Sequence, residues 1–545
     1  MAGAGQVQRN GVLTLSLPSL DEKDPLFTEK KRLSHARNLD FTFHLLLPSP
    51  IRKLLLILDE IVQAARILYL NDVEMYFMEV DDFGPFSQRN ELESLNAVLQ
   101  MLISMFSGAN PHEMETLNEL QKATIGKLNS IAVHPSEKVI TEKVDMISEE
   151  LLLKWGQTHG AKLKVTISYF EEANRGVMAL EDINVGESAL EIPESIIISE
   201  DLLCKSDMFK VLNEWDGMTT DTLLLLWSMR ERYDPLSDFK NYFETLPDSF
   251  NTGLSFGISA LTVLHGTLVF EELLQAKEHL RQQYDLLFPA LCASYPNIFR
   301  TELFSWDHYL WACELWYSNS MKVIFSDGKL KTCLVPIAGL MNHSVSPHII
   351  HYGRVDTETK SLKFQLARPC KGGEQCYLSY GSLSGSHLVT FYGFLPKGDN
   401  PYDIIPLDFE VPDADNSYSQ AVESSRTSHM VRGTWFSSRN KPHIKYGLPP
   451  LLLTHLRSVL KKGDMEDPSM ATEDDENEVS ERALLETIIS IFEPLMEGLG
   501  EMPDLDRDDL SWDVKLALEY KDLQRRIVSS VLSTCLAGLE IRGSI

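Results

Sequence analysis

The sequence lacks the marks of a secreted, membrane-embedded or metal-clustered protein. Its seven cysteines are scattered over 545 residues and include no CxxC pair, so they indicate neither a disulfide framework nor a zinc cluster. No apolar run reaches the roughly eighteen uncharged residues of a membrane helix. Residues 1–40 lack the apolar core of a secretory signal and contain acidic residues that transit peptides usually avoid. We therefore expect a soluble intracellular protein of the cytoplasm or nucleus rather than of a plastid, with no metal.

Positive charge is also scarce. There are 50 lysines and arginines against 79 acidic residues, which gives a formal net charge of −29. Nucleic-acid binding needs a basic face, so we expect no nucleic-acid partner, and we expect no membrane partner either. The ordinary reading of the acidic balance is solubility, and basic protein substrates fit it only weakly.

What is present is a strong helical pattern at both ends of the chain. Apolar residues recur at helical spacing within 54–68, 91–106 and 113–131, which predicts a helical N-terminal extension over residues 1–148, without a chemical motif. Helical spacing returns at 451–460, 483–499 and 512–539, which predicts a helical C-terminal domain over residues 396–545. Between these helices, we expect 417–445 to be a loop and the acidic run 464–481 to be a disordered loop.

The middle of the chain has a different texture. Short β-branched and aromatic runs separated by turn residues predict strands. The predicted strands are 164–170, 188–192, 195–198, 335–339, 348–355, 362–367 and 375–380. They flank a helical insert over about 201–320, so the pattern predicts an α+β fold.

Four ordered segments resemble one family. The first joins Trp155-Gly156 to the turn around Gly176, and the second runs from Arg230 to Thr267 within the insert. The third contains Asn342-His343, and the fourth contains Tyr380-Gly381 with Tyr392-Gly393-Phe394. Together they resemble the SET domain protein methyltransferases of the class of the Rubisco large-subunit and actin histidine methyltransferases.

The resemblance implies an architecture. Residues 149–395 would form a SET domain of small twisted β-sheets, in which the Asn-His segment and the tyrosine segment pass each other in a knot-like crossing. Residues 396–545 would form the substrate-binding domain of the Rubisco methyltransferase class.

The resemblance also implies a cofactor, S-adenosylmethionine, and a set of site residues. Tyr380 would be the catalytic tyrosine, and Tyr352, Tyr380 and Tyr392 would line the substrate channel. The residues that would hold the cofactor are Ala173, Asn174, Arg175, Gly176, Asn319, Asn342, His343 and Phe394. The alternative for the aromatic residues is ordinary core packing, and for Asn342 it is a tight turn.

Two positions depart from the family pattern. Asn319 stands where the family usually has an arginine that reaches the cofactor carboxylate, and Gly339 stands where it commonly has aspartate. A third, smaller departure is the sequence 385–387. Losing a charge-assisted contact typically costs a few kcal/mol of binding, so we expect weakened cofactor affinity unless Arg175 or Lys322 compensates.

Three functional hypotheses follow. The leading one is methyl transfer to a lysine side chain of a non-histone protein by a monomeric enzyme. A close variant is methylation of a protein histidine. The third, motivated by Asn319 and Gly339, is an inactive SET fold that only binds a protein partner.

Overall fold

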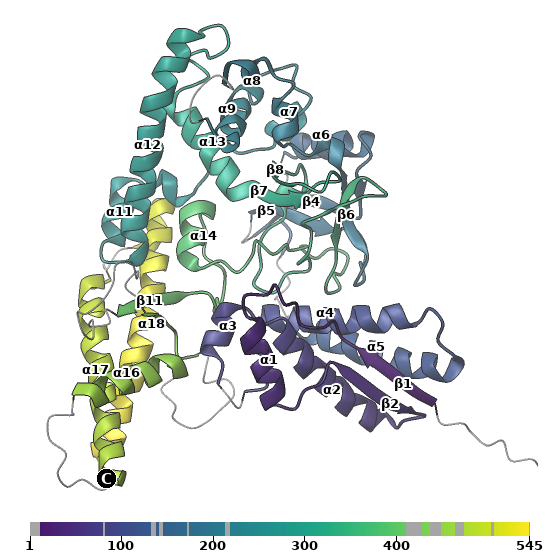
Figure 1. Ribbon diagram of the computed structural model, residues 1–545. Helices are drawn as coiled ribbons and strands as arrows, with labels where there is room; N and C mark the ends of the chain where they lie inside the picture. Colours follow the sequence, from purple (N-terminus) through teal and green to yellow (C-terminus); the bar gives the residue numbers. More distant parts are fainter. Residues whose placement is uncertain are drawn as a thin grey trace, which may run out of the picture.

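The computed structural model describes residues 11–79, 82–131, 138–140, 145–171, 174–212, 218–409, 427–435, 448–463, 473–502 and 506–543. Its buried hydrophobic residues form three large clusters. Figure 1 shows the N-terminal elements below the central strands, and the tall helices of the insert and of the C-terminal part along one side. No helix among the described residues has the length and apolar character needed to cross a membrane.

The N-terminal region contains a strand pair, so its expected all-helical character is wrong. The antiparallel strands β1 (Gly11–Ser16) and β2 (Thr42–Leu47) bury alternate leucines against the helices, because successive strand residues point to opposite faces. The helices are α1 (Phe27–Ala36), α2 (Ile51–Leu68), α3 (Asp72–Phe77), α4 (Gln88–Met105) and α5 (Pro111–Ser130).

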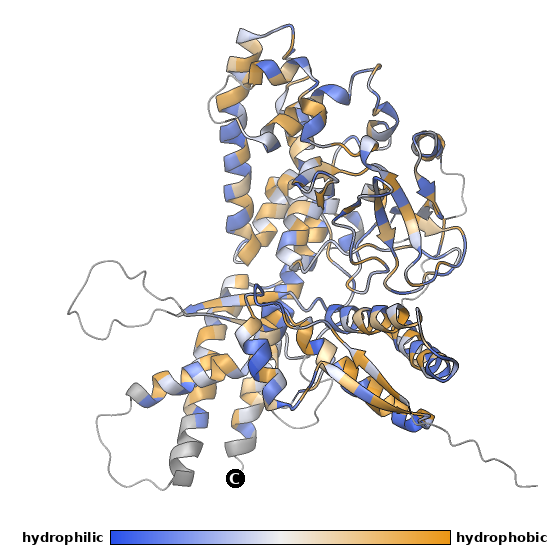
Figure 2. Cartoon of the chain, turned by 45° about the vertical axis from the view of Figure 1, so that its right-hand side comes forward, coloured by the Kyte–Doolittle hydropathy of each residue, from blue (hydrophilic) through white to orange (hydrophobic). Residues whose placement is uncertain are grey.

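Side-chain caps define where helices α3 and α5 begin. Asn71 and Glu74 form a reciprocal capping box at α3, and Asn110 and Glu113 form another at α5. Both boxes satisfy backbone N–H groups that a helix start leaves without intrahelical partners. Figure 2 shows hydrophobic and hydrophilic residues sharing the surfaces of these and the other long helices, as amphipathic helices require.

The central part is a set of small antiparallel sheets, as expected for α+β. Helix α6 (Ile147–Thr158) precedes them. One sheet has the order β3-β6-β10-β9, and two further pairs are β4-β5 and β7-β8. The strands are β3 (Lys162–Leu163), β4 (Val165–Phe170), β5 (Asn174–Ala179), β6 (Ser188–Pro193), β7 (Ser320–Ile324), β8 (Leu330–Leu334), β9 (Val355–Asp356) and β10 (Ser361–Gln365).

Four of the predicted strands are corrected. Residues 195–198 enter a 3₁₀ turn (Glu194–Ile196), and strand β8 ends at Leu334, before the predicted 335–339. Ile337 has φ 69°, a left-handed conformation that interrupts any strand there. Of 348–355, only Val355 lies in a named strand, with isolated bridges at Ile349 and Arg354. The predicted strand 375–380 contains only isolated bridges, at Gln375 and Leu378.

The expected helical insert is present. Its helices are α7 (Glu200–Leu203), α8 (Asp207–Leu212), α9 (Thr220–Glu231), α10 (Lys240–Phe243), α11 (Ile258–Leu264), α12 (Leu268–Ser294) and α13 (Trp306–Asn319). Helix α14 (Gly385–Tyr392) lies between the two parts of the last motif and ends at Tyr392. The core of the strands continues into α9 and α13, whereas residues of α11 and α12 belong to a second core shared with the C-terminal helices.

The C-terminal part is helical but also contains a strand pair, β11 (Ile404–Phe409) and β12 (Thr427–Arg432). The predicted loop 417–445 is therefore wrong at β12. Helices α16 (Pro450–Gly463), α17 (Glu473–Leu499) and α18 (Trp512–Gly543) follow. The acidic run is helical from Glu473 onward. Its residues 464–472 lie outside the described part.

Candidate active site

Strand β5 brings a glycine against two side-chain amides. Asn174 opens β5 with φ 58°, a left-handed conformation that asparagine tolerates. A Cβ on Gly176 would lie 2.5 Å from Oε1 of Gln375 and 2.9 Å from Nδ2 of Asn342, so only glycine fits there. Ala173, the remaining predicted residue of this segment, lies outside the described residues.

Asn342 is held by two acceptors. Its Nδ2 donates to the carbonyl oxygen of Arg175 at 2.9 Å and to Oε1 of Gln375 at 2.8 Å. Both donor hydrogens of the amide are therefore used, and Oδ1 remains as its acceptor. The predicted neighbours Arg175, Gly176 and Asn342 thus meet at one place.

His343 lies in a short parallel bridge to Leu378. The bridge uses the oxygen of Asn342 and the nitrogen of Ser344, so the backbone N–H and C=O of His343 face away from Leu378. Leu378 also bridges Ile349, which places the tyrosine segment against two parts of the Asn-His segment, as the expected crossing requires.

The imidazole of His343 is neutral at physiological pH. Its Nδ1 accepts the backbone N–H of Tyr380 at 3.1 Å, so the proton of the neutral ring sits on Nε2. Burial lowers the pKa of His343 to about 4. The ring stacks on Tyr380 with a centroid distance of 5.1 Å and lies 6.3 Å from Phe394.

The side chain of Arg175 points to other partners. Its Nη1 donates to Oε1 of Glu149 at 3.0 Å and to the carbonyl oxygen of Thr245. Arg175 therefore contributes its backbone to this site, while its guanidinium is held by α6 and the insert. The expected compensation for the missing arginine does not come from this side chain in the observed arrangement.

The three predicted tyrosines are neighbours. The Tyr380 hydroxyl donates to the carbonyl oxygen of Met341 at 2.7 Å, and its ring stacks on Tyr392 at 5.1 Å. The Tyr352 hydroxyl donates to the carbonyl oxygen of Ser379 at 2.6 Å. Burial first, and then the neighbouring phenols, raise the pKa of Tyr380, and burial also raises the pKa of Tyr352, so both phenols stay protonated at neutral pH.

A small cavity of about 40 Å³ lies at the hydroxyl end of Tyr380. None of the described residues that line it carries a formal charge at neutral pH. The lining residues are Ser318, Asn319, Ser320, Met321, Ala338, Gly339, Met341, Tyr352, Leu378, Tyr380 and Tyr392. The cavity has room for a few heavy atoms.

The two departures from the family pattern face each other at this cavity. A Cβ on Gly339 would lie 3.6 Å from Oδ1 of Asn319, and Nδ2 of Asn319 donates to Oγ of Ser318 at 2.7 Å. Neither position carries a charge, so this wall is polar but neutral.

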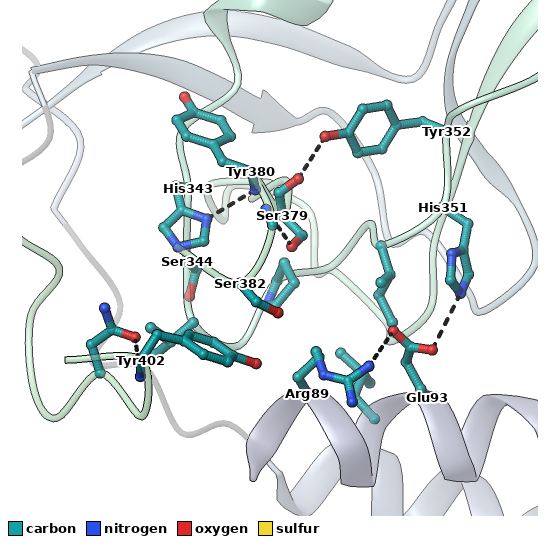
Figure 3. Close-up of a pocket in the computed structure, with 16 residues that line it drawn as sticks. Arg89, Glu93, His343, Ser344, His351, Tyr352, Ser379, Tyr380, Ser382 and Tyr402 are labelled. Carbon is teal, nitrogen blue, oxygen red and sulfur yellow. Dashed lines mark hydrogen bonds and ion pairs between the residues drawn. The ribbon is translucent and has the colours of Figure 1, made fainter. Parts of the chain in front are cut away.

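A second cavity of about 280 Å³ lies on the other side of the tyrosines. Helix α4 closes it from below with Arg89, Leu92 and Glu93 (Figure 3). Nη1 of Arg89 donates to Oε1 of Glu93 at 3.0 Å, and Oε2 of Glu93 lies 4.0 Å from Nε2 of His351. Tyr352 and Tyr380 line both cavities.

Sequence reasoning missed several of these residues. The wall that α4 contributes to the larger cavity had no local signal in the sequence, because α4 meets the central part only through contacts between distant residues. One example is the hydrogen bond from Nδ2 of Asn96 to the carbonyl oxygen of Ala367, which lies 271 residues further along the chain. Gln375 is the first residue of the predicted strand 375–380 but had no assigned role. Met341 was also missed, because a carbonyl oxygen leaves no trace in side-chain patterns.

Comparison with known proteins matches part of the chain to a domain family. Residues 174–381 match the family model of the SET domain. The actin-histidine N-methyltransferase of Gallus gallus is 25% identical over 280 residues, which are 50% of this chain and 46% of that protein. The chloroplastic Rubisco large-subunit N-methyltransferase of Pisum sativum is 25% identical over 323 residues, 57% of this chain and 63% of the relative. The aligned part thus spans about half to two thirds of these relatives.

Solved structures agree on the fold. A SET domain of LSMT bound to lysine and AdoHcy aligns with TM-score 0.51 and 17% identity, over 74% of this chain and 94% of that one. Rubisco LSMT bound to sinefungin and monomethyllysine aligns with TM-score 0.51 and 19% identity, over 73% and 94%. The chain therefore contains a SET domain over residues 174–381, within a fold shared with the Rubisco large-subunit methyltransferases.

Proposed function

We propose that this protein is an S-adenosylmethionine-dependent protein methyltransferase that acts on a lysine side chain of a non-histone protein. The observation that supports this is that the three tyrosines line one small uncharged cavity, while His343 stacks on Tyr380 and the adjacent Asn342 is held against the backbone of Arg175. By name, one of the relatives above methylates a histidine of actin and the other methylates the large subunit of Rubisco, and the similar solved structures hold lysine or monomethyllysine, which favours the same reaction class.

The residues present fit two ends of the cofactor. Oδ1 of Asn342 is an acceptor for the ammonium group of the cofactor. The backbone N–H and C=O of His343, which face away from Leu378, suit the edge of the adenine, and Phe394 lies near the imidazole of His343. For the carboxylate end, the amide of Asn319 replaces an arginine and already donates to Ser318. When bound, S-adenosylmethionine supplies an electrophilic methyl group on a sulfonium.

The chain's own residues then prepare the acceptor. A free lysine amine has a pKa of about 10.4 and must lose a proton before it can accept a methyl group. An uncharged cavity disfavours the ammonium form, because no carboxylate among the described lining residues stabilises it. The Tyr380 proton is engaged by Met341, so the hydroxyl oxygen offers lone pairs that orient an N–H of the neutral amine.

Histidine is the second candidate acceptor, and Gly339 favours it. An imidazole is mostly neutral at physiological pH and needs no carboxylate to attract a cation. Glycine also leaves more space beside Asn319 than an aspartate would.

We further propose that residues 396–545 grip a folded substrate protein and that the enzyme is a monomer. The support is that α17 and α18 form a long helical surface joined to the insert through a shared core, close to α14 and the tyrosines.

The test is calorimetric titration of the full chain with S-adenosylmethionine, with Asn342→Ala as the comparison. Micromolar binding that the substitution abolishes supports the proposal. No binding at millimolar cofactor overturns it and favours an inactive, partner-binding SET fold. Where binding is found, methyl-labelled proteins from extract are digested, and mass spectrometry of the modified residue distinguishes lysine from histidine.

A further inference from the structure

The orientation of the Asn342 amide depends on a residue outside the predicted site. An asparagine amide can turn over and exchange its oxygen and nitrogen. Here Nδ2 faces the carbonyl oxygen of Arg175, which accepts only, so this position must be the donor. Gln375 supplies the second acceptor at 2.8 Å, which leaves Oδ1 of Asn342 as the atom that can receive a ligand.

Gln375 is itself fixed by the surrounding backbone. It is 5% exposed, and it bridges Met178 of β5. The next residue, Cys376, donates its backbone N–H to the carbonyl oxygen of Val177 at 2.7 Å. The amide pair therefore sits on the same strand pairing that carries Gly176, whose missing Cβ makes room for both amides.

We propose that Gln375 is a positioning residue that sets the Asn342 amide so that its Oδ1 receives the ammonium group of the cofactor's amino-acid end. The proposal rests on the proposed function. Loss of the second acceptor leaves one N–H of Asn342 without a partner, so the carbonyl oxygen of Arg175 alone holds the amide and the observed orientation is weakened. The damage falls on the amino-acid end of the ligand and spares the adenosine end.

The test compares two ligands that differ only at that end. S-adenosylhomocysteine carries the amino-acid group, and 5′-deoxy-5′-methylthioadenosine has the same adenosine thioether without it. Their dissociation constants are measured calorimetrically for the full chain, for Gln375→Leu and for Gln375→Glu. Gln524→Leu is the control, because Gln524 is equally buried but belongs to the C-terminal core.

We expect Gln375→Leu to raise the dissociation constant of S-adenosylhomocysteine about tenfold, while that of methylthioadenosine changes less than twofold. Gln375→Glu keeps an acceptor and restores S-adenosylhomocysteine binding to within about threefold, and the control leaves the ratio of the two constants unchanged. If the binding of both ligands weakens equally, or neither dissociation constant changes, the positioning role of Gln375 is overturned while the proposed function stands. A wild-type chain that binds neither S-adenosylhomocysteine nor S-adenosylmethionine overturns the proposed function and the inference together.

Discussion

The Tyr380 hydroxyl donates a hydrogen bond to the carbonyl oxygen of Met341, and its ring stacks on those of His343 and Tyr392. This arrangement separates the two contributions of the side chain. The ring supports the packing of the site, whereas the hydroxyl oxygen faces the small cavity where we place the acceptor. Substitutions that keep the ring and remove the oxygen therefore report on chemistry more than on folding.

Tyr380→Phe keeps the stacked ring and removes the hydroxyl. We expect the turnover number to fall about 100-fold or more, because the acceptor nitrogen loses its orienting partner, while cofactor affinity stays within about threefold. Single-turnover methylation and calorimetry on the same preparation measure the two effects. Turnover within a few-fold of wild type would contradict a catalytic role for this residue.

Gly176→Ala tests the space in front of the amides. The new Cβ would stand 2.5 Å from Oε1 of Gln375, so the Asn342 and Gln375 amides must separate. We expect S-adenosylmethionine affinity to fall about tenfold or more through lost hydrogen bonds. Gly126→Ala is the matched control, since nothing lies within 4 Å of its Cβ in helix α5 and alanine suits a helix interior. Unchanged affinity in Gly176→Ala would show that the amides yield without cost.

At the scale of elements, the short segments that carry the motifs contact one another through small sheets and isolated bridges, and no long sheet joins them among the described residues. Helix α14 is an example. The carboxylate of Asp403, which lies just before β11, accepts the backbone N–H of Gly385 at the start of this helix and an N–H of Asn400 at 3.2 Å. Asp403 thereby joins the SET domain to the C-terminal part.

Burial raises the pKa of Asp403 to about 6 from an ordinary value of 3.8. The folded state thus favours the protonated acid, so this stabilising contribution is complete below about pH 4 and is lost as the pH rises through 6. Asp403→Asn stays neutral, and we expect it to gain about 2–3 kcal/mol of unfolding free energy over wild type between pH 4 and pH 7. Chemical denaturation at several pH values measures this gain. A difference that does not depend on pH would contradict it.

At the scale of the whole molecule, the cores do not follow the predicted domain boundary at residue 396. Leu264, Val269 and Leu273 of the insert are fully buried in a cluster completed by C-terminal residues such as Leu484 and Val531. The C-terminal part is therefore a structural partner of the insert as well as the proposed substrate-binding surface.

A chain ending at residue 395 would expose this apolar face of the insert. We expect it to aggregate or to unfold at a melting temperature at least about 10 °C below that of the full chain, because several buried side chains, each worth about 2 kcal/mol, lose their partners. Differential scanning fluorimetry and light scattering test this. A truncated chain that melts as cooperatively and as high as the full one would show that the two cores are independent.

The sequence allowed the fold to be predicted where the signal is local or ordered. Helical spacing located α2, α4, α5 and α18, and the order of the motifs identified the SET domain. Strands held by single bridges, such as the region around Ile349, were predicted with the wrong form because no ladder imposes a regular alternation.

The site was predicted in part for the same reason. The side chains near Asn342 and Tyr380 were named from motifs, and the structure brings those it describes together. Gln375, Met341 and the wall from α4 depend on contacts between distant segments or on backbone atoms, for which side-chain spacing carries no signal. The direction of the Arg175 side chain follows from Glu149, which no motif includes.

The shared rings of Tyr352 and Tyr380 have a thermodynamic consequence. Each ring is a wall of the 40 Å³ cavity and of the 280 Å³ cavity, so a molecule that shifts either ring changes the free energy of whatever occupies the other side. Linkage makes this effect reciprocal: the factor by which one occupant alters the affinity of the second equals the factor in the reverse direction. Helix α4 floors the larger cavity, so under the proposed function an occupant held against this helix would change the affinity for the acceptor without touching it.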